Sequence, residues 1–91
     1  MTTLTTGNLN QDYEIIDAIF AIDSHKGGFL TAVDPGKAFD GVKAQLRKSC
    51  ESLGGNAVVH CQFEYRNAST EGFVGKKQVI EIFAYGTAVR A

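Results

Sequence analysis

Cysteine, histidine and proline are scarce in this chain, which has two cysteines, two histidines, one proline and no tryptophan among 91 residues. The two cysteines, Cys50 and Cys61, match no zinc or redox motif, because such motifs need paired Cys-x-x-Cys spacing or further histidine ligands. The single proline, together with 44% hydrophobic and 21% charged residues, excludes a disordered or low-complexity chain. The composition is therefore that of a globular protein.

Neither sign of charge is in surplus, since nine lysines and arginines oppose ten acidic residues and leave a formal net charge of −1. Nucleic-acid affinity depends largely on neutralising phosphates, so this balance argues against a nucleic-acid partner. No stretch approaches the ~20 apolar residues of a membrane span, and the first residues have neither the basic start nor the apolar run of a secretory signal. We therefore expect a cytoplasmic protein with no membrane partner and with reduced cysteines.

Hydrophobic periodicity predicts a single α+β domain over residues 1–91, with the order β-α-β-β and a short extra strand in front. Side chains that alternate between an apolar face and a more polar face predict strands at residues 13–23, 57–65 and 78–90. Residues 2–6 are predicted as a weak strand. Apolar residues three and four positions apart predict a helix at 35–53. Asp34-Pro35 is a helix-start signature, and Gly54 is a residue that commonly ends a helix. Residues 24–33 and 66–77 contain glycine and polar residues, and we interpret them as loops.

The expected core lies between this helix and one face of the sheet. Leu46 should pack there with Ile82, Val59 and Phe20, the last as part of an apolar face formed by Ile16, Ala18, Phe20 and Ile22. One helix cannot cover both faces of the sheet. The other face should carry five apolar residues, which are Ile15, Ile19, Phe83, Tyr85 and Val89. An exposed apolar patch of this kind usually marks a contact surface, so we expect a homo-oligomer.

Three motifs, in order along the chain, resemble the YbjQ family of small bacterial proteins. They are Thr2-Thr3 with Tyr13-Glu14-Ile15-Ile16, then Leu53-Gly-Gly-Asn-Ala-Val-Val59 after an amphipathic helix, and finally Ala84-Tyr-Gly-Thr-Ala-Val89. The resemblance implies a dodecin-like subunit, with the last strand central in a three-stranded antiparallel sheet, and a ring-shaped homopentamer. The chain departs from the family pattern before the helix, where relatives have a longer insertion.

The expected subunit contacts follow from the apolar face and from the N-terminal strand. Ile19, Phe83 and Tyr85 should lie in the interface. Thr3 and Leu4 belong to a strand that is too short to hold itself in place, so we expect it to pair with a neighbouring subunit and blunt that neighbour's strand edge. A dimer of rings is a further option at high concentration.

The family label, heavy-metal binding, directs attention to the metal-ligating side chains. A metal site needs three or four converging ligands. His60 and Cys61 are adjacent in a strand, so their side chains should point to opposite faces. His60 and Glu64 should share one face, and a ring could gather several copies of this pair around its axis. His60 and Glu64 are therefore the candidate metal ligands, although we expect Cys50 and Cys61 to act as buried small hydrophobes.

No arrangement for catalysis is evident. Cys61 beside His60 does not place a nucleophile next to a base, and the two glycine pairs are not followed by a phosphate-binding motif. Asn56 should tie its side chain to nearby backbone. Two hypotheses remain open: a non-enzymatic protein without cofactor whose working unit is a ring, and a small-ligand or heavy-metal-binding module with sites between subunits.

Overall fold

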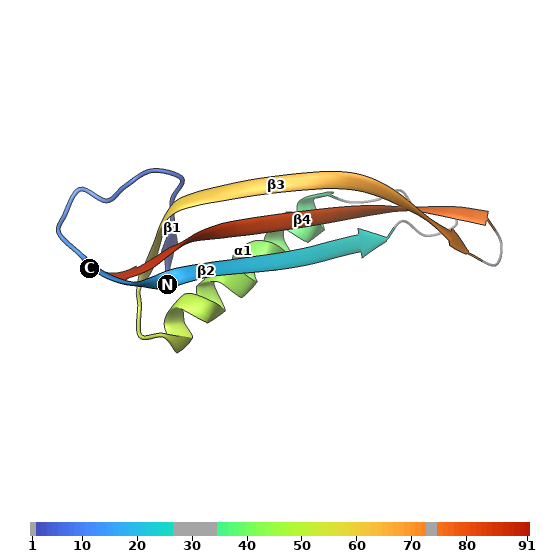
Figure 1. The fold of residues 1–91 in the computed structure, drawn as a ribbon. Coiled ribbons are helices and arrows are strands. Elements are labelled where there is room, and N and C mark those ends of the chain that lie inside the picture. Colours follow the sequence, from blue (N-terminus) through green and yellow to red (C-terminus); the bar gives the residue numbers. More distant parts are fainter. Residues whose placement is uncertain (1, 27–34, 73–74) are drawn as a thin grey trace.

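The computed structural model describes residues 2–26, 35–72 and 75–91, and shows one helix packed on a four-stranded mixed sheet (Figure 1). The elements are β1 (Thr3–Leu4), β2 (Glu14–Lys26), α1 (Pro35–Ser52), β3 (Ala57–Gly72) and β4 (Gly75–Arg90). The strand order is β1-β3-β4-β2, so the last strand is central as expected. Strands β2 and β3 pair antiparallel with β4, and β1 pairs parallel with β3. The predicted helix start at Asp34 lies outside the described residues.

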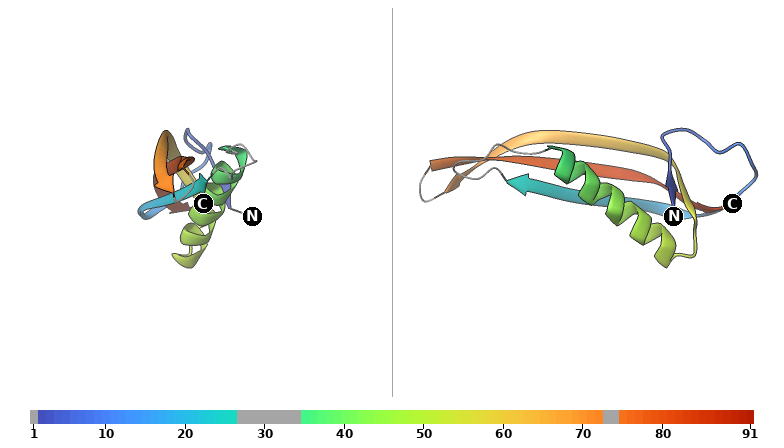
Figure 2. Two further views of the ribbon diagram at one scale, coloured as in Figure 1. Left: turned by 90° about the vertical axis from the view of Figure 1, so that its right-hand side faces the viewer. Right: turned by 180° about the vertical axis from the view of Figure 1, so that it is seen from behind.

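Helix α1 crosses one face of the sheet and leaves the opposite face without a helix (Figure 2). Its buried residues lie four apart and therefore on one face of the helix: Ala38, Val42, Leu46 and Cys50. Gly54 ends the helix with a φ of +85°, a left-handed conformation that favours glycine. The backbone N–H of Gly54 donates to Glu51 and that of Gly55 to Cys50, which together form a Schellman cap.

The main core lies between α1 and the sheet. Leu46 and Ile82 are the largest of its fully buried side chains, and Val58, Cys61, Ala84 and Ala88 surround them. Gly86 allows β4 to approach β3 closely, because a Cβ atom there would lie 2.8 Å from Val58 Cγ1 and 3.1 Å from the Val59 carbonyl oxygen. The predicted pairing of Leu46 with Ile82 in one core is confirmed.

The prediction of which β2 side chains face the core is wrong beyond Ile16. The pairing with β4 shifts between Ile15 and Asp17, and this irregularity reverses the inward and outward alternation that follows. Ile19 and Ala21 are buried in the core against α1, whereas Phe20 is 69% and Ile22 53% exposed on the other face. Ile19, which we expected in a subunit interface, therefore belongs to the subunit's own core.

A second irregularity reverses the alternation in β3. The register shifts between Val59 and Gln62, and His60 in the middle has a φ of +53°. As a result Val58 faces the main core, whereas Ala57 and Val59 lie with Val89 in a separate buried cluster on the opposite face. Leu9 and Tyr13 from the N-terminal segment cover this cluster. Val59 is thus not a core partner of Leu46, and Val89 is not exposed.

The predicted loop at residues 66–77 is in large part a β-ribbon. Strands β3 and β4 remain paired as far as Gly72↔Gly75, whereas β2 ends at Lys26↔Val79, so the pairs from Ser69↔Gln78 onward extend beyond β2. The ribbon gives the chain its length, with extents of 53 × 22 × 19 Å and a radius of gyration of 15.7 Å. A compact domain of this size would have a radius of gyration of about 12 Å. The outer part of this ribbon has no third strand among the described residues and so needs no hydrophobic alternation, which is why the polar sequence there resembled a loop.

The N-terminal strand is held by its own chain. The Thr3 N–H donates to the Asn56 carbonyl and the Thr5 N–H to that of Val58, while the Thr2 hydroxyl donates to Glu51 over 2.6 Å. Leu4 packs against the main core. The expectation that this segment pairs with a neighbouring subunit's strand is therefore corrected: β1 pairs with β3 of the same chain, because β3 offers an edge beside it.

Candidate functional site

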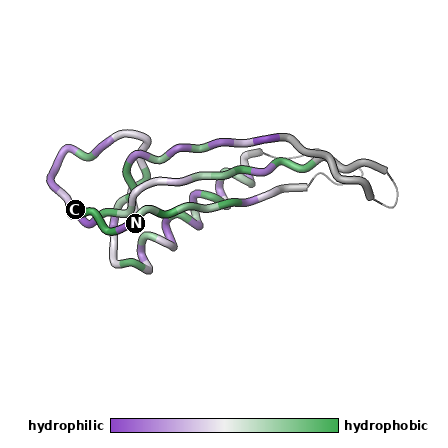
Figure 3. Tube along the Cα trace, in the orientation of Figure 1, coloured by the Kyte–Doolittle hydropathy of each residue, from purple (hydrophilic) through white to green (hydrophobic). Residues whose placement is uncertain are grey.

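The exposed face of the sheet, opposite α1, carries the residues of greatest functional interest. Cross-strand pairing places Phe20 beside Tyr85 on β4, and Ile22 beside Phe83. We name these four residues the open-face patch. Phe83 is 39% and Tyr85 42% exposed, and their ring centroids lie 6.0 Å apart. β2 is hydrophobic along most of its length, whereas β3 has hydrophilic stretches on its way to the ribbon (Figure 3).

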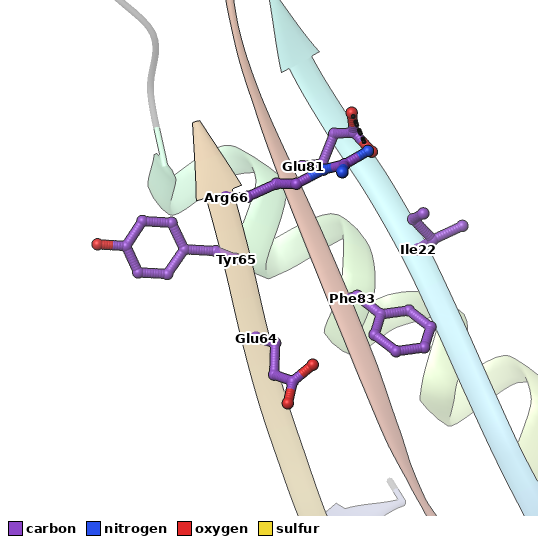
Figure 4. Close-up of a pocket in the computed structure, with 6 residues that line it drawn as sticks. All are labelled: Ile22, Glu64, Tyr65, Arg66, Glu81 and Phe83. Carbon is purple, nitrogen blue, oxygen red and sulfur yellow. Dashed lines mark hydrogen bonds and ion pairs between the residues drawn. The ribbon is translucent and has the colours of Figure 1, made fainter. Parts of the chain in front are cut away.

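A shallow pocket adjoins the open-face patch toward the ribbon, with a volume of about 350 Å³ (Figure 4). Ile22 and Phe83 form its apolar part, and Glu64, Arg66 and Glu81 its polar part. The Arg66 guanidinium donates to both carboxylate oxygens of Glu81, each over 3.3 Å. Tyr65 also lines the rim, and in Figure 4 its side chain points away from the pocket, beyond the outer edge of β3. The pocket joins apolar surface to an exposed ion pair.

Only half of the open-face patch lies where the sequence pattern predicts it. Phe83 and Tyr85 are exposed on this face as predicted, but Phe20 and Ile22 were assigned to the core. Period-two alternation identified them as an apolar face, and only the irregularity at Ile15/Asp17 determines which way that face points. No residue type in the sequence marks this position. Thr3 is exposed on β1, and Leu4 packs inward.

The candidate metal ligands do not form a complete site within the part of the chain that the structure describes. His60 and Glu64 are both exposed, but His60 lies inside the irregularity between Val59 and Gln62, so their spacing no longer places them on one face. Among residues 2–26, 35–72 and 75–91, no three His, Cys, Asp or Glu side chains come close enough to hold a metal ion. His60 instead has a backbone role, since its N–H donates to the Gly7 carbonyl.

Both cysteines are buried free thiols in the main core. The Cys50 thiol donates to the Ala57 carbonyl over 3.3 Å, and that of Cys61 to the Val58 carbonyl over 3.7 Å. Burial raises the pKa of each thiol above its ordinary value, which outweighs the opposite effect of the neighbouring backbone hydrogen bonds. A protonated thiol is a poor nucleophile and a poor metal ligand. Both residues therefore act as small hydrophobic side chains.

We predict that native protein reacts slowly with a thiol reagent such as dithiobis-nitrobenzoate, and quickly once it is unfolded in denaturant. A folded-state pKa above the unfolded value also means that each thiol favours folding at neutral pH and that this contribution is lost as the pH rises above the unfolded-state value of about 8.5. The Cys50→Ala, Cys61→Ala double variant should fold and should lose less stability between pH 8 and 10 than the parent. Fast labelling of native protein would contradict the assignment.

Asn56 has the structural role expected of it. Its side-chain amide donates to the Ala91 carbonyl and its side-chain carbonyl accepts from the Ala91 N–H, both over 2.9 Å. The Asn56 N–H also donates to the Val89 carbonyl. The side chain thus continues the pairing of β4 beyond the end of the strand, which fixes the turn between α1 and β3. Asn56 is therefore not part of the pocket.

Comparison with known proteins agrees with this architecture. A family model described as "Putative heavy-metal-binding", that of the YbjQ family, matches residues 36–91, which include most of α1 and all of β3 and β4. A crystal structure of a protein of unknown function from the DUF74 family of Pediococcus pentosaceus ATCC 25745 has a similar fold, with a TM-score of 0.71 and 24% sequence identity. The alignment covers 98% of this chain and 96% of that one. No curated protein matches the chain.

The structural likeness extends to β1 and β2, so the whole chain has the fold that the sequence motifs implied. No helix among the described residues is long and apolar enough to span a membrane. Since the family model covers more than half of the chain, from α1 to the end of β4, the protein belongs to the YbjQ family.

Proposed function

We propose that the protein works as a non-enzymatic subunit of a homo-oligomer, in which the open-face patch is buried against another copy. The observation that supports this proposal is the open-face patch, whose four apolar residues lie together on one sheet face. Phe20 is 69% and Ile22 53% exposed, and the aromatic side chains of Phe83 and Tyr85 lie beside them. Soluble monomers rarely expose a contiguous cluster of this kind, and large exposed patches mark contact surfaces. Aromatic residues are also those most enriched in the centre of protein interfaces.

The proposed assembly is a closed ring of five subunits in the cytoplasm. The number five comes from the family resemblance alone, while the need for closure is physical: a head-to-tail contact that did not close would grow into filaments. Burial of both cysteines as free thiols is consistent with a reducing compartment. The N-terminal segment supports the assembly indirectly, because β1 occupies part of the β3 edge and prevents unspecific strand pairing there.

Sedimentation equilibrium of the full chain tests the proposal. The expected species is five times the subunit mass of 9.8 kDa at tens of micromolar protein. A 9.8 kDa species that persists throughout this range would refute self-association.

A second candidate function, binding of a heavy metal between subunits, is favoured by the description of the family model. Within one chain the described residues form no three-ligand group, so a site would have to combine copies of His60 or Glu64 from several subunits. Such a site would depend on assembly. It would also be lost when the side chain that supplies its ligands is removed.

We expect only weak uptake of Zn²⁺ or Cu²⁺ without fixed stoichiometry, because exposed single ligands bind these ions poorly. Isothermal titration calorimetry of wild type, His60→Ala and Glu64→Ala measures this, with the exposed Asp12→Ala as the matched control. A submicromolar site with a fixed ratio of metal to subunit, lost in His60→Ala or Glu64→Ala but kept in Asp12→Ala, would instead establish the metal-binding function.

A further inference from the structure

The two outer edges of the sheet differ in how their backbone groups are satisfied. On β2, side chains occupy three of these groups: Asp17 accepts from the Ala18 N–H over 2.8 Å, Asp23 accepts from the Ser24 N–H over 3.0 Å, and Gln45 donates to the Ile22 carbonyl over 3.0 Å. Side chains that bind edge groups in this way protect a strand from pairing with another chain. The β2 edge is therefore a poor site for adding a strand.

The outer edge of β3 is open over much of its length. β1 pairs with Ala57 and Val58, and the last backbone hydrogen bond between the two segments joins the Cys61 N–H to the Thr5 carbonyl. From Gln62 to the end of β3, no described strand lies on this side. Backbone groups alternate in direction along a strand, and the Cys61 N–H points outward, so the N–H and C=O groups of Phe63 and Tyr65 point outward as well. These groups are free to pair with another extended strand.

The residues along this open edge have a charge pattern that is complementary to itself. Glu64 and Arg66 flank Tyr65, and both lie on the open face. If two copies of β3 pair antiparallel with Tyr65 at the two-fold axis, Glu64 of each copy lies opposite Arg66 of the other. These would be non-hydrogen-bonded pairs, the type in which side chains approach most closely.

We propose that the β3 edge at residues 62–68 is a second interaction surface, which pairs antiparallel with the same edge of a second copy about Tyr65. The contact joins two sheets into one and forms two cross-strand ion pairs between Glu64 and Arg66. Arg66 already contacts Glu81 on the neighbouring strand, so each pair would extend a row of alternating charges across both sheets. The Glu64 carboxylate makes no hydrogen bond or ion pair with the described part of its own chain and can take this role.

The position of Tyr65 supports the same contact. Its side chain is 65% exposed, and Figure 4 shows it extending past the open edge of β3 rather than over the sheet. An aromatic side chain in this position has little of its own chain to pack against. In the proposed pairing the two Tyr65 side chains lie side by side at the centre of the contact, where an aromatic pair contributes to the stability of strand pairing.

This contact is independent of the open-face patch, so it would join two copies of the assembly that the patch forms. The contact is isologous, since the same residues serve both partners, and each β3 edge therefore binds only one other edge. The test uses the full chain with Glu64→Arg or Arg66→Glu. Each single variant places like charges opposite each other and should weaken the doubling about tenfold or more. An equimolar mixture of the two variants restores opposite charges at both pairs and should restore the doubling.

Native mass spectrometry and sedimentation velocity report the outcome, with Asp12→Arg as a control that makes the same charge change as Glu64→Arg at another exposed site. Circular dichroism confirms that each variant is folded. The proposal is overturned if wild type shows no doubled species, if single variants double as wild type does, or if their mixture does not form the mixed species. Phe83→Asp separates the two proposals, because it should dissociate the ring and leave the edge-to-edge dimer.

Discussion

Leu46→Ala should lower the free energy of unfolding of the subunit by about 2–5 kcal/mol, which is the usual cost of truncating a fully buried leucine. Leu46 has no solvent exposure and packs in the main core, which also contains Ile82, Val58 and Cys61. The rigid sheet on one side and α1 on the other leave little room for the cavity to collapse. Urea denaturation followed by circular dichroism measures this loss as a lower urea concentration at the unfolding midpoint, with an unchanged dependence of the unfolding free energy on urea concentration.

Phe20→Ala is the matched control for the face assignment of β2. The sequence pattern placed Phe20 in the same core as Leu46, whereas the structure leaves it 69% exposed on the other face. It should therefore cost the isolated subunit no more than about 0.5 kcal/mol, as surface substitutions do. The comparison is made in a Phe83→Asp background, in which assembly no longer contributes to stability. Equal losses from Leu46→Ala and Phe20→Ala would show that the alternation in β2 is not reversed.

Phe83→Asp should weaken subunit assembly at least about a hundredfold while leaving the subunit folded. The substitution removes an aromatic ring from the centre of the open-face patch and places a carboxylate opposite Glu64, its cross-strand neighbour on β3. In an interface this charge would be buried without a partner, at a cost of several kcal/mol. In the free subunit Phe83 is 39% exposed, so a carboxylate at the same position stays in contact with water.

Sedimentation equilibrium over a hundredfold range of concentration measures the change, with Phe83→Leu as the control that keeps the position apolar. We expect Phe83→Leu to assemble nearly as well as wild type. Wild-type assembly in Phe83→Asp would show that the open-face patch lies outside the interface. Unfolding of Phe83→Asp would be visible by circular dichroism. In that case Tyr85→Asp, at the adjacent 42% exposed position, provides the same test.

Local chemistry made several elements predictable from the sequence. Apolar residues three and four positions apart identified α1. Gly54 identified its end, because a helix commonly ends at a residue in the left-handed conformation. Alternation of side chains along β4 gave its two faces correctly, because the extra residue of each irregularity lies in β2 or β3 and leaves the alternation of β4 unbroken. The position of β4 at the centre of the sheet came from the family resemblance.

The sequence by itself thus determined where α1 and the inner parts of the three long strands lie, that one sheet face lacks a covering helix, and that Phe83 and Tyr85 lie on that face. Only the tertiary structure decided which residues of β2 and β3 join them. Each of those strands contains one irregularity, at Ile15/Asp17 and at Val59/Gln62, and a single extra residue turns every following side chain to the other face. It also decided that β1 binds its own β3. Strand pairing depends on which edge lies nearby, and nothing local in residues 2–6 specifies that edge.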